Sequence, residues 1–134
     1  MSIILITGAN KGIGLEIVKQ HIDRGDDVIA VCRKPSDALL ATEAKIISGI
    51  EFLDKNFETI LLEQLQVSTI DRVVANAGIR GFDNFEDFDV DAIREQFEVN
   101  AVAPLRLLKA IDHLLPNKAK VVLISTRVAS HEDN

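Results

Sequence analysis

The chain has 134 residues, of which 47% are hydrophobic, enough for a folded core and too apolar for a disordered chain. A net charge of −6 argues against nucleic acid or an anionic membrane surface as a partner. No apolar run approaches the ~18 residues that span a bilayer, no basic leader precedes the first apolar run, and the single Cys32 fits a reducing compartment. We therefore expect one cytoplasmic domain over residues 1–134.

Short apolar runs alternate with segments of helical periodicity along the whole chain. The runs are continuous rather than alternating, as in the buried strands of parallel sheets. We predict five strands, at Ile3–Thr7, Val28–Cys32, Ile50–Leu53, Arg72–Ala75 and Val121–Ser125. Between them we predict helices at Gly12–Arg24, Pro35–Thr42, Phe57–Gln66 and Val90–Leu115. A polar loop at Gly78–Asp89 precedes the last helix. This alternation predicts an α/β fold, a parallel sheet with helices on both faces.

Three further expectations concern side chains on the helices. Six apolar residues of the last helix recur at helical spacing and should face a core: Ile93, Phe97, Leu105, Leu108, Ile111 and Leu115. His21 and His113 have no evident partners and should lie at the surface. The acids before that helix, Asp83, Glu86, Asp87, Asp89 and Asp91, complement its dipole, so we assign no metal site.

The first apolar run leads directly into a glycine-rich turn and then a helix. Gly8, Gly12 and Gly14 are typical of a turn in which the backbone must approach the phosphates of a nucleotide at a helix N-terminus. The alternative is that these glycines merely end a strand and start a helix. Thr7 and Asn10 should hydrogen-bond the turn. The predicted cofactor-binding residues of the turn are Thr7, Gly8, Asn10, Lys11, Gly12, Ile13 and Gly14.

The residues after the second strand indicate which dinucleotide binds. An acid there would bind the ribose 2′-hydroxyl of NAD, but the chain has Arg33 and Lys34. Arg33 can bind a 2′-phosphate through two hydrogen bonds, and Lys11 adds a second positive charge. The alternative is that these are solvated loop charges. We predict that the cofactor is NADP.

Polar or small residues follow three later strands. Asp54 could accept a hydrogen bond from the adenine amino group, or it could cap the following helix. Asn76, Ala77 and Gly78 would let a cofactor lie across the sheet edge, or they form a strand-to-loop turn. The hydroxyls of Ser125 and Thr126 would face the same crevice, or they only complete a strand end.

Asn100 and Pro104 form a pair within the last helix. Because Pro104 has no N–H, the carbonyl of Asn100 loses its usual partner and the helix should kink there. The free carbonyl would be a suitable position for an ordered water. The alternative is a proline kink tolerated for packing.

With these residues in place, the chain resembles the short-chain dehydrogenase/reductase family. Residues 7–14 are similar to its T-G-x-x-x-G-x-G fingerprint, and residues 76–78 to its N-A-G motif, with Ala75 in place of the first Asn of the usual pair. Asn100 falls where the family's catalytic Asn lies. The Asn-Lys pair in the glycine turn, and Asn100 followed by Pro104, resemble the carbonyl-reductase-like and C-factor-like branch most.

The resemblance implies a Rossmann-type doubly wound sheet with strand order 3-2-1-4-5, ending here after the fifth strand. It implies hydride transfer from NADPH to the carbonyl of a small-molecule substrate. Thr126, or Ser125 as the alternative, would hydrogen-bond the carbonyl oxygen, and Asn100 would hold a water linking a Lys to solvent. The family's Tyr-x-x-x-Lys motif would supply the general acid, and the 134 residues contain no Tyr.

Two hypotheses therefore remain. The favoured one is that the chain is the N-terminal part of an NADPH-dependent reductase and is inactive alone. The other is that the short chain is itself a non-catalytic nucleotide-binding or interaction module. Such a module would bind NADP(H) or dimerise through the helix at Val90–Leu115, whose apolar face makes that helix the candidate surface for a homo-oligomer.

Overall fold

The structure is a computed structural model that describes residues 1–79 and 84–125. The described residues form one five-stranded parallel sheet with strand order β3-β2-β1-β4-β5. The strands are β1 Ile3–Thr7, β2 Asp27–Val31, β3 Lys45–Ile47, β4 Arg72–Ala75 and β5 Lys120–Leu123. The helices are α1 Gly12–Asp23, α2 Asp37–Leu40, α3 Phe57–Gln64, α4 Val90–Phe97, the π-helical turn η1 Glu98–Val102, α5 Ala103–Ile111 and the 3₁₀ turn η2 Asp112–Leu114. The predicted α/β fold and strand order are confirmed.

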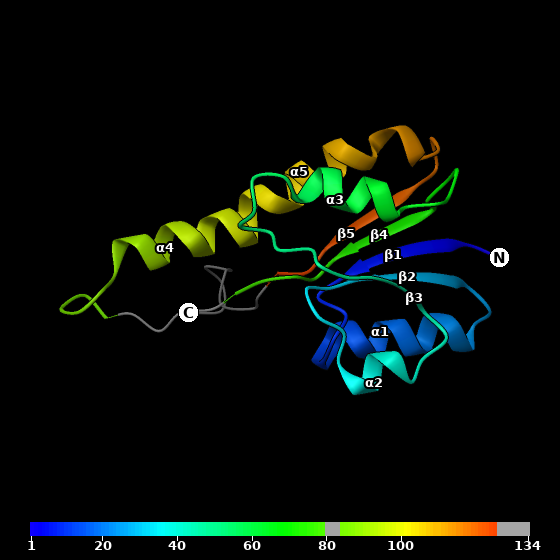
Figure 1. The fold of residues 1–134 in the computed structure, drawn as a ribbon, viewed down its shortest axis with the longest axis horizontal. Coiled ribbons are helices and arrows are strands. Elements are labelled where there is room, and N and C mark those ends of the chain that lie inside the picture. The colour runs from blue at the N-terminus through cyan, green and yellow to red at the C-terminus, as the bar shows by residue number, and fades with distance from the viewer. Residues whose placement is uncertain (80–83, 126–134) are drawn as a thin grey trace, which may run out of the picture.

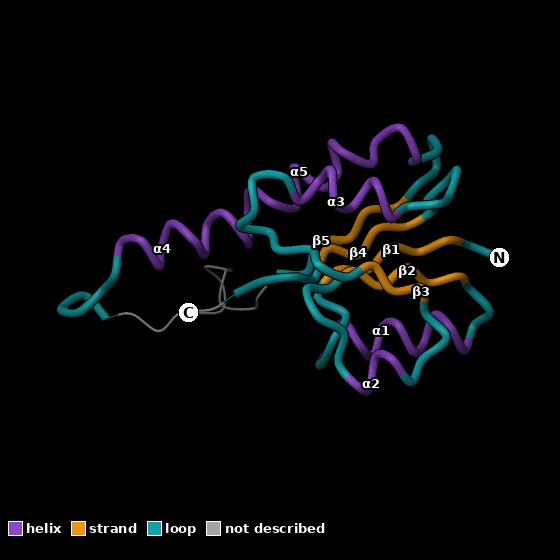
Figure 2. Tube along the Cα trace, in the orientation of Figure 1, coloured by secondary structure: helices purple, strands orange, loops and turns teal. Residues whose placement is uncertain are grey.

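Helices cover the sheet on both faces. Figure 1 shows α1 and α2 on one side of the strands and α3 and α5 on the other, and Figure 2 shows the same three layers. Successive residues of β1 point to opposite layers. Leu5 packs in the cluster under α3 and α5, whereas Ile4 and Ile6 pack in the cluster with Val18 of α1. Because both faces of β1 are buried, its sequence is apolar throughout.

The third strand lies earlier in the chain than predicted. The apolar run at Ile50–Leu53 is a loop, and the strand that pairs with β2 is Lys45–Ile47. Gly49 turns the chain with a positive φ of 75° and donates its N–H to the carbonyl of Arg33. Ile50 is buried nonetheless, because the loop packs onto the same core as α3. Leu53, at the other end of the run, is 40% exposed, so the apolar run marks one buried residue rather than a buried strand.

The last predicted helix is helical from Val90 to Leu114 without a break, but several of its apolar side chains do not face the core. Ile93, Phe97 and Leu105 are 44%, 64% and 65% exposed, so they do not face the core as expected. In Figure 1 α4 extends beyond the sheet, and none of its residues is buried. Ile111, on α5, is fully buried, as expected. The homo-oligomer through this helix stays a prediction.

His21 is buried rather than exposed, contrary to the prediction. Gly25, with a positive φ of 85°, ends α1 in a Schellman turn in which the N–H of Asp26 bonds to the carbonyl of His21. This turn brings the Asp26 carboxylate 2.8 Å from His21 Nδ1. The hydrogen bond to His21 holds the pKa of Asp26 below its usual value. His113 is exposed, as expected, and among the described helices none has the length and apolarity needed to cross a membrane.

Candidate functional site

The glycine turn packs against the end of β4 so closely that two of its glycines are required. A Cβ on Gly8 would lie 2.9 Å from Ala77 N and Asn76 O, and one on Gly14 would overlap the Gly8 carbonyl oxygen. Gly8 and Gly12 both adopt positive φ, but a Cβ on Gly12 would meet open space. Packing therefore accounts for Gly8 and Gly14, and Gly12 leaves the backbone open where a ligand could approach.

Hydrogen bonds fix the ends of β1 and β4 to each other. The Oγ1 of Thr7 accepts from the N–H groups of Asn76 and Ala77, both at 3.0 Å. The side-chain Nδ2 of Asn76 donates to the carbonyl of Gly8 at 3.2 Å. Thr7 thus holds β4 rather than the turn itself, and Asn76 bonds the turn in its place.

Two adjoining grooves meet at the glycine turn. One, of about 400 Å³, is lined by Gly8, Asn10, Lys11, Gly12, Ile13, Asn76, Ala77 and Gly78. The other, of about 270 Å³, shares four of these residues and continues along Cys32, Arg33 and the loop from Ile50 to Leu53. Most of the predicted cofactor-binding residues therefore lie on one continuous surface at the carboxyl edge of the sheet. Ile13 is 62% exposed on its rim.

The charges on this surface include one acid that sequence reasoning missed. The Arg33 side chain is 78% exposed, and its Nη1 lies 3.5 Å from Oε2 of Glu51. Glu51 comes from the loop after β3 rather than from the end of β2, where an acid was sought. No sequence signal could have placed it there, because the loop was predicted to be a strand.

Asp54 makes a local contact. Its Oδ1 accepts from the N–H of Asn56 at 2.8 Å, just before α3 begins. The groove is lined at this point by Phe52 and Leu53. Asp54 is not the helix cap, because the N-cap of α3 is Asn56 and no side chain caps that helix. The adenine contact stays a prediction.

Asn100 lies in the π-helical turn and is held by the chain after β4. Its Oδ1 accepts from Ile79 N at 2.8 Å, and its Nδ2 donates to Ile79 O at 2.7 Å. The predicted kink takes the form of a widened turn, in which Ala103 N–H bonds to the carbonyl of Glu98, five residues earlier. A Cβ on Gly78 would lie 3.2 Å from Asn100 Oδ1, so Gly78 makes room for this clamp.

The two candidate hydroxyls follow β5. Ile124 N–H still bonds to the carbonyl of Ala75, and the exposed Ser125 comes next, at the same edge of the sheet as Asn76. Thr126 lies outside the described residues. The catalytic roles of Asn100, Ser125 and Thr126 stay predictions.

Arg106 is a structural centre that the sequence did not reveal. Its Nε donates to Glu58 Oε2 at 2.9 Å, its Nη1 to Glu98 at 3.3 Å and its Nη2 to the carbonyl of Lys55 at 3.0 Å. The guanidinium also lies 4.3 Å from the centroid of the Phe57 ring. It holds the pKa of Glu58 below its usual value. Since Glu58 is 48 residues away in sequence, no local pattern indicates the contact.

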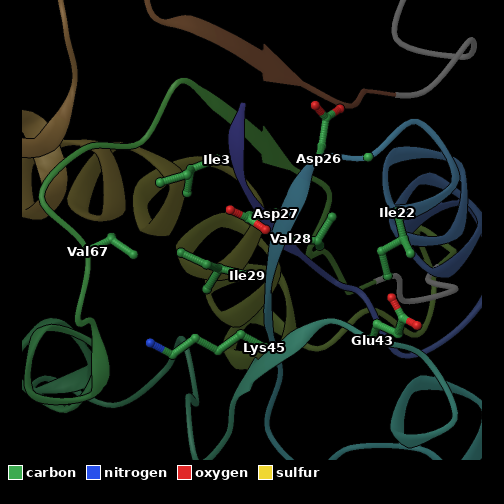
Figure 3. A pocket seen from close by; sticks show the side chains of 10 residues that line it. Ile3, Ile22, Asp26, Asp27, Val28, Ile29, Glu43, Lys45 and Val67 are labelled. Atoms are coloured by element: carbon green, nitrogen blue, oxygen red, sulfur yellow. The ribbon is translucent and has the colours of Figure 1, made fainter. Parts of the chain in front are cut away.

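A separate hollow lies at the opposite edge of the sheet, where β1, β2 and β3 begin. Figure 3 shows Ile3, Asp27 and Lys45 around it. One of its carboxylates, Asp26, already binds His21 and the N–H of Ser2. None of the predicted site residues lines this hollow, so the candidate site is the pair of grooves at the carboxyl edge.

Comparison with known proteins gives consistent results. Residues 2–132 match a family model described as short chain dehydrogenase. The chain is 36% identical over 136 residues to the 1-hydroxy-2-glutathionyl-2-methyl-3-butene dehydrogenase of Rhodococcus sp. (strain AD45), covering 100% of this chain and 60% of that protein. It is 34% identical to the short chain dehydrogenase gsfK of Penicillium aethiopicum, covering 92% of this chain and 56% of that protein.

A solved structure agrees with both. The carbonyl reductase of Pseudomonas aeruginosa PAO1 in complex with NADP is 30% identical, with a TM-score of 0.88, over 98% of this chain and 64% of that one. The chain thus spans about three fifths of the length of the proteins it matches.

Proposed function

This chain belongs to the short-chain dehydrogenase family, and we propose that it provides the NADP-binding part of a reductase that acts on a small-molecule carbonyl compound. The observation that carries the proposal is the continuous groove surface at the glycine turn, with Lys11 on one stretch and Arg33 on the other. The NADP complex of the similar carbonyl reductase supports it. Bound NADPH would supply the hydride.

The chain's own residues fit the two charged parts of this cofactor. The pyrophosphate would lie over Gly12, where there is open space and where the N–H groups of α1 begin. The first turn of α1 has no acidic residue to repel it. The 2′-phosphate would bind Arg33 and Lys11, with Arg33 leaving its exposed contact with Glu51.

At the reacting end, we assign roles by family resemblance. Ser125 or Thr126 would donate a hydrogen bond to the substrate carbonyl oxygen. Asn100, fixed by Ile79, would position a water for proton transfer. The 134 residues contain no Tyr to act as the general acid. We therefore propose that these residues alone bind NADPH without reducing a carbonyl compound.

Titration of the protein with NADPH and with NADH, followed by nicotinamide fluorescence, tests the cofactor assignment. We expect tighter binding of NADPH. Arg33→Asp should weaken NADPH binding by about 10- to 100-fold, the loss of one charge-assisted contact, and leave NADH binding nearly unchanged. Arg94→Asp is the matched control, because Arg94 is also 78% exposed but lies on α4. Equal affinities, or no effect of Arg33→Asp, would contradict the NADP assignment.

An assay for NADPH oxidation tests the proposed inactivity. The 134-residue protein is mixed with NADPH and an aromatic aldehyde, and absorbance of the reduced nicotinamide is followed. We expect binding without consumption. Steady consumption above the rate of the same mixture without protein would show that another group donates the proton.

A further inference from the structure

The two stretches that carry the candidate phosphate-binding cations are joined by three hydrogen bonds. The Oγ of Ser36 donates to the main-chain carbonyl of Asn10 at 2.7 Å. The N–H of Ser36 donates to Asn10 Oδ1 at 2.8 Å, and Asn10 Nδ2 donates to the carbonyl of Lys34 at 2.8 Å. These bonds link residues 24 to 26 positions apart, so they fix the glycine turn to the loop after β2.

Asn10 stands where this link has most effect on a ligand. It lines both grooves, and its neighbour Lys11 lines the phosphate side. On the other side of the link, Arg33 lines the second groove just before Lys34. Asn10 therefore helps to fix the separation of the Lys11 and Arg33 backbones, beyond the pairing of β1 with β2 that ends at Thr7 and Val31.

Ser36 is itself held from the other side. Its Oγ accepts from the N–H of Leu39 at 3.2 Å, which caps α2, while the same hydroxyl donates to Asn10. The hydroxyl thus uses its donor on the glycine turn and an acceptor position on α2. One side chain connects three elements: the turn after β1, the loop after β2 and the start of α2.

We propose that Ser36 is a positioning residue for cofactor selectivity. By holding Asn10 against the loop after β2, it keeps Lys11 and Arg33 at the spacing that one 2′-phosphate can bridge. The hydroxyl supplies one of the three bonds, and the Ser36 N–H and Asn10 Nδ2 supply the other two. Losing the hydroxyl loosens the link, so ordering the two long cations on one phosphate costs more conformational entropy. The inference deepens the proposed function and rests on it, because it concerns the same NADP site.

The affinity ratio of NADPH to NADH is the decisive measurement. Both cofactors contact the same groove and differ only by the 2′-phosphate, so a general loosening of the fold affects them equally and cancels in the ratio. We expect Ser36→Ala to raise the Kd for NADPH about fivefold, the cost of ordering one more long side chain on binding, with the Kd for NADH changed less than about twofold. Ser36→Thr keeps the hydroxyl and should retain the parent ratio.

Thr42→Ala is the matched control at the other end of α2. Its Oγ1 donates to the carbonyl of Leu39 at 2.7 Å and accepts from Ala44 N at 3.3 Å, so a comparable pair of bonds is lost away from the grooves. This variant should keep the parent ratio. If Ser36→Ala does not fold, Ser36→Gly removes the same hydroxyl with little cost to the helix start, and we expect the same loss of selectivity.

The outcomes separate this proposal from the proposed function. A parent protein that binds neither cofactor, or that does not prefer NADPH, overturns the proposed NADP site and the role of Ser36 with it. A parent that prefers NADPH, with a hydroxyl-free variant at position 36 that keeps the parent ratio, overturns the role of Ser36 alone. The same holds if Thr42→Ala changes the ratio as much.

Discussion

β1 and β5 have similar sequences and opposite surroundings. Both are runs of aliphatic residues in the same parallel sheet. Leu5 of β1 is fully buried between β2 and β4, with helices on both faces, whereas Leu123 of β5 is 55% exposed. Among the described strands β5 pairs only with β4. In both β1 and β5 an apolar run indicated the strand, but the number of neighbours decides how much each strand contributes to stability.

The same contrast separates the two halves of the candidate site. The cofactor half lies over the buried strands, and its loops are joined by hydrogen bonds from Thr7, Asn10 and Asn76. The proposed reacting half, with Asn100 and Ser125, lies on exposed elements. The apolar side chains of β5 and α4 are exposed, so any chain that packed against them would change their surroundings more than those of any other described part of the molecule.

The largest effect on stability is expected at the closest contact in the glycine turn, which belongs to the cofactor half. In Gly14→Ala the new Cβ meets the Gly8 carbonyl oxygen and lies 2.7 Å from Asn76 Nδ2, so backbone must shift. We expect the free energy of unfolding to fall by about 4 kcal/mol or more in denaturant titrations. Gly49→Ala, at a positive φ of 75° with nothing nearby, should cost only about 1–2 kcal/mol. Equal losses would show that strain in φ, not the close contact, dominates.

Truncation of one leucine in each strand measures the contrast directly. Leu5→Ala should lower the free energy of unfolding by about 3 kcal/mol, because it leaves a cavity in a closed core. Leu123→Ala should cost less than about 1 kcal/mol, because its side chain is already half in water. Chemical denaturation of both variants gives the comparison, and similar losses would mean that β5 is covered in solution.

Substitution of Arg106 tests the contact between α5 and α3, in the helical layer that joins the two halves. Arg106→Met leaves Glu58 and the carbonyl of Lys55 without their donor, and we expect a loss of about 2 kcal/mol in thermal or denaturant unfolding. Arg94→Met removes an exposed Arg from α4 and should change stability by less than about 0.5 kcal/mol. A neutral Arg106→Met would show that water replaces the guanidinium contacts.

The smallest effect is on the pH dependence of stability, through the pair formed by His21 and Asp26. Because the hydrogen bond to His21 lowers the pKa of Asp26, the folded state binds fewer protons there than the unfolded chain does. This stabilisation is present above the unfolded pKa of about 3.9 and is lost as pH falls through the lower folded pKa. Asp26→Asn, and likewise His21→Gln, should flatten the melting temperature across about pH 5 to pH 3. An unchanged slope would exclude this pair as a source of acid sensitivity.

Sequence reasoning predicted what depends on local chemistry. The continuous apolar runs at β1, β2 and β4 gave the fold, and the spacing of Gly8 and Gly14 gave the turn that the structure packs against β4. It failed where tertiary contacts decide. The run at Ile50–Leu53 is a loop in which Ile50 is buried and Leu53 is exposed, because Gly49 turns the chain after the end of β3.

Longer-range partnerships were out of reach for the same reason. Nothing in the local sequence distinguishes Arg106 from a solvated helix charge, since its carboxylate partner Glu58 lies on another helix. Ser36 was not singled out in the sequence, because its bond to Asn10 depends on how two loops approach each other. Such contacts become visible only when the elements are packed.

The π-helical turn at Glu98–Val102 has a consequence for sequence alignment. A π turn holds one residue more than the α-helical turn it replaces, so α5 is rotated by about 100° against the face it would otherwise continue from α4. Deleting a single residue here would restore regular α-helix, and the rotation would fall on α4, because α5 is held by the buried Leu107 and Ile111 whereas no residue of α4 is buried. A relative with a one-residue gap at this position would therefore present a different set of α4 positions on each side of that helix.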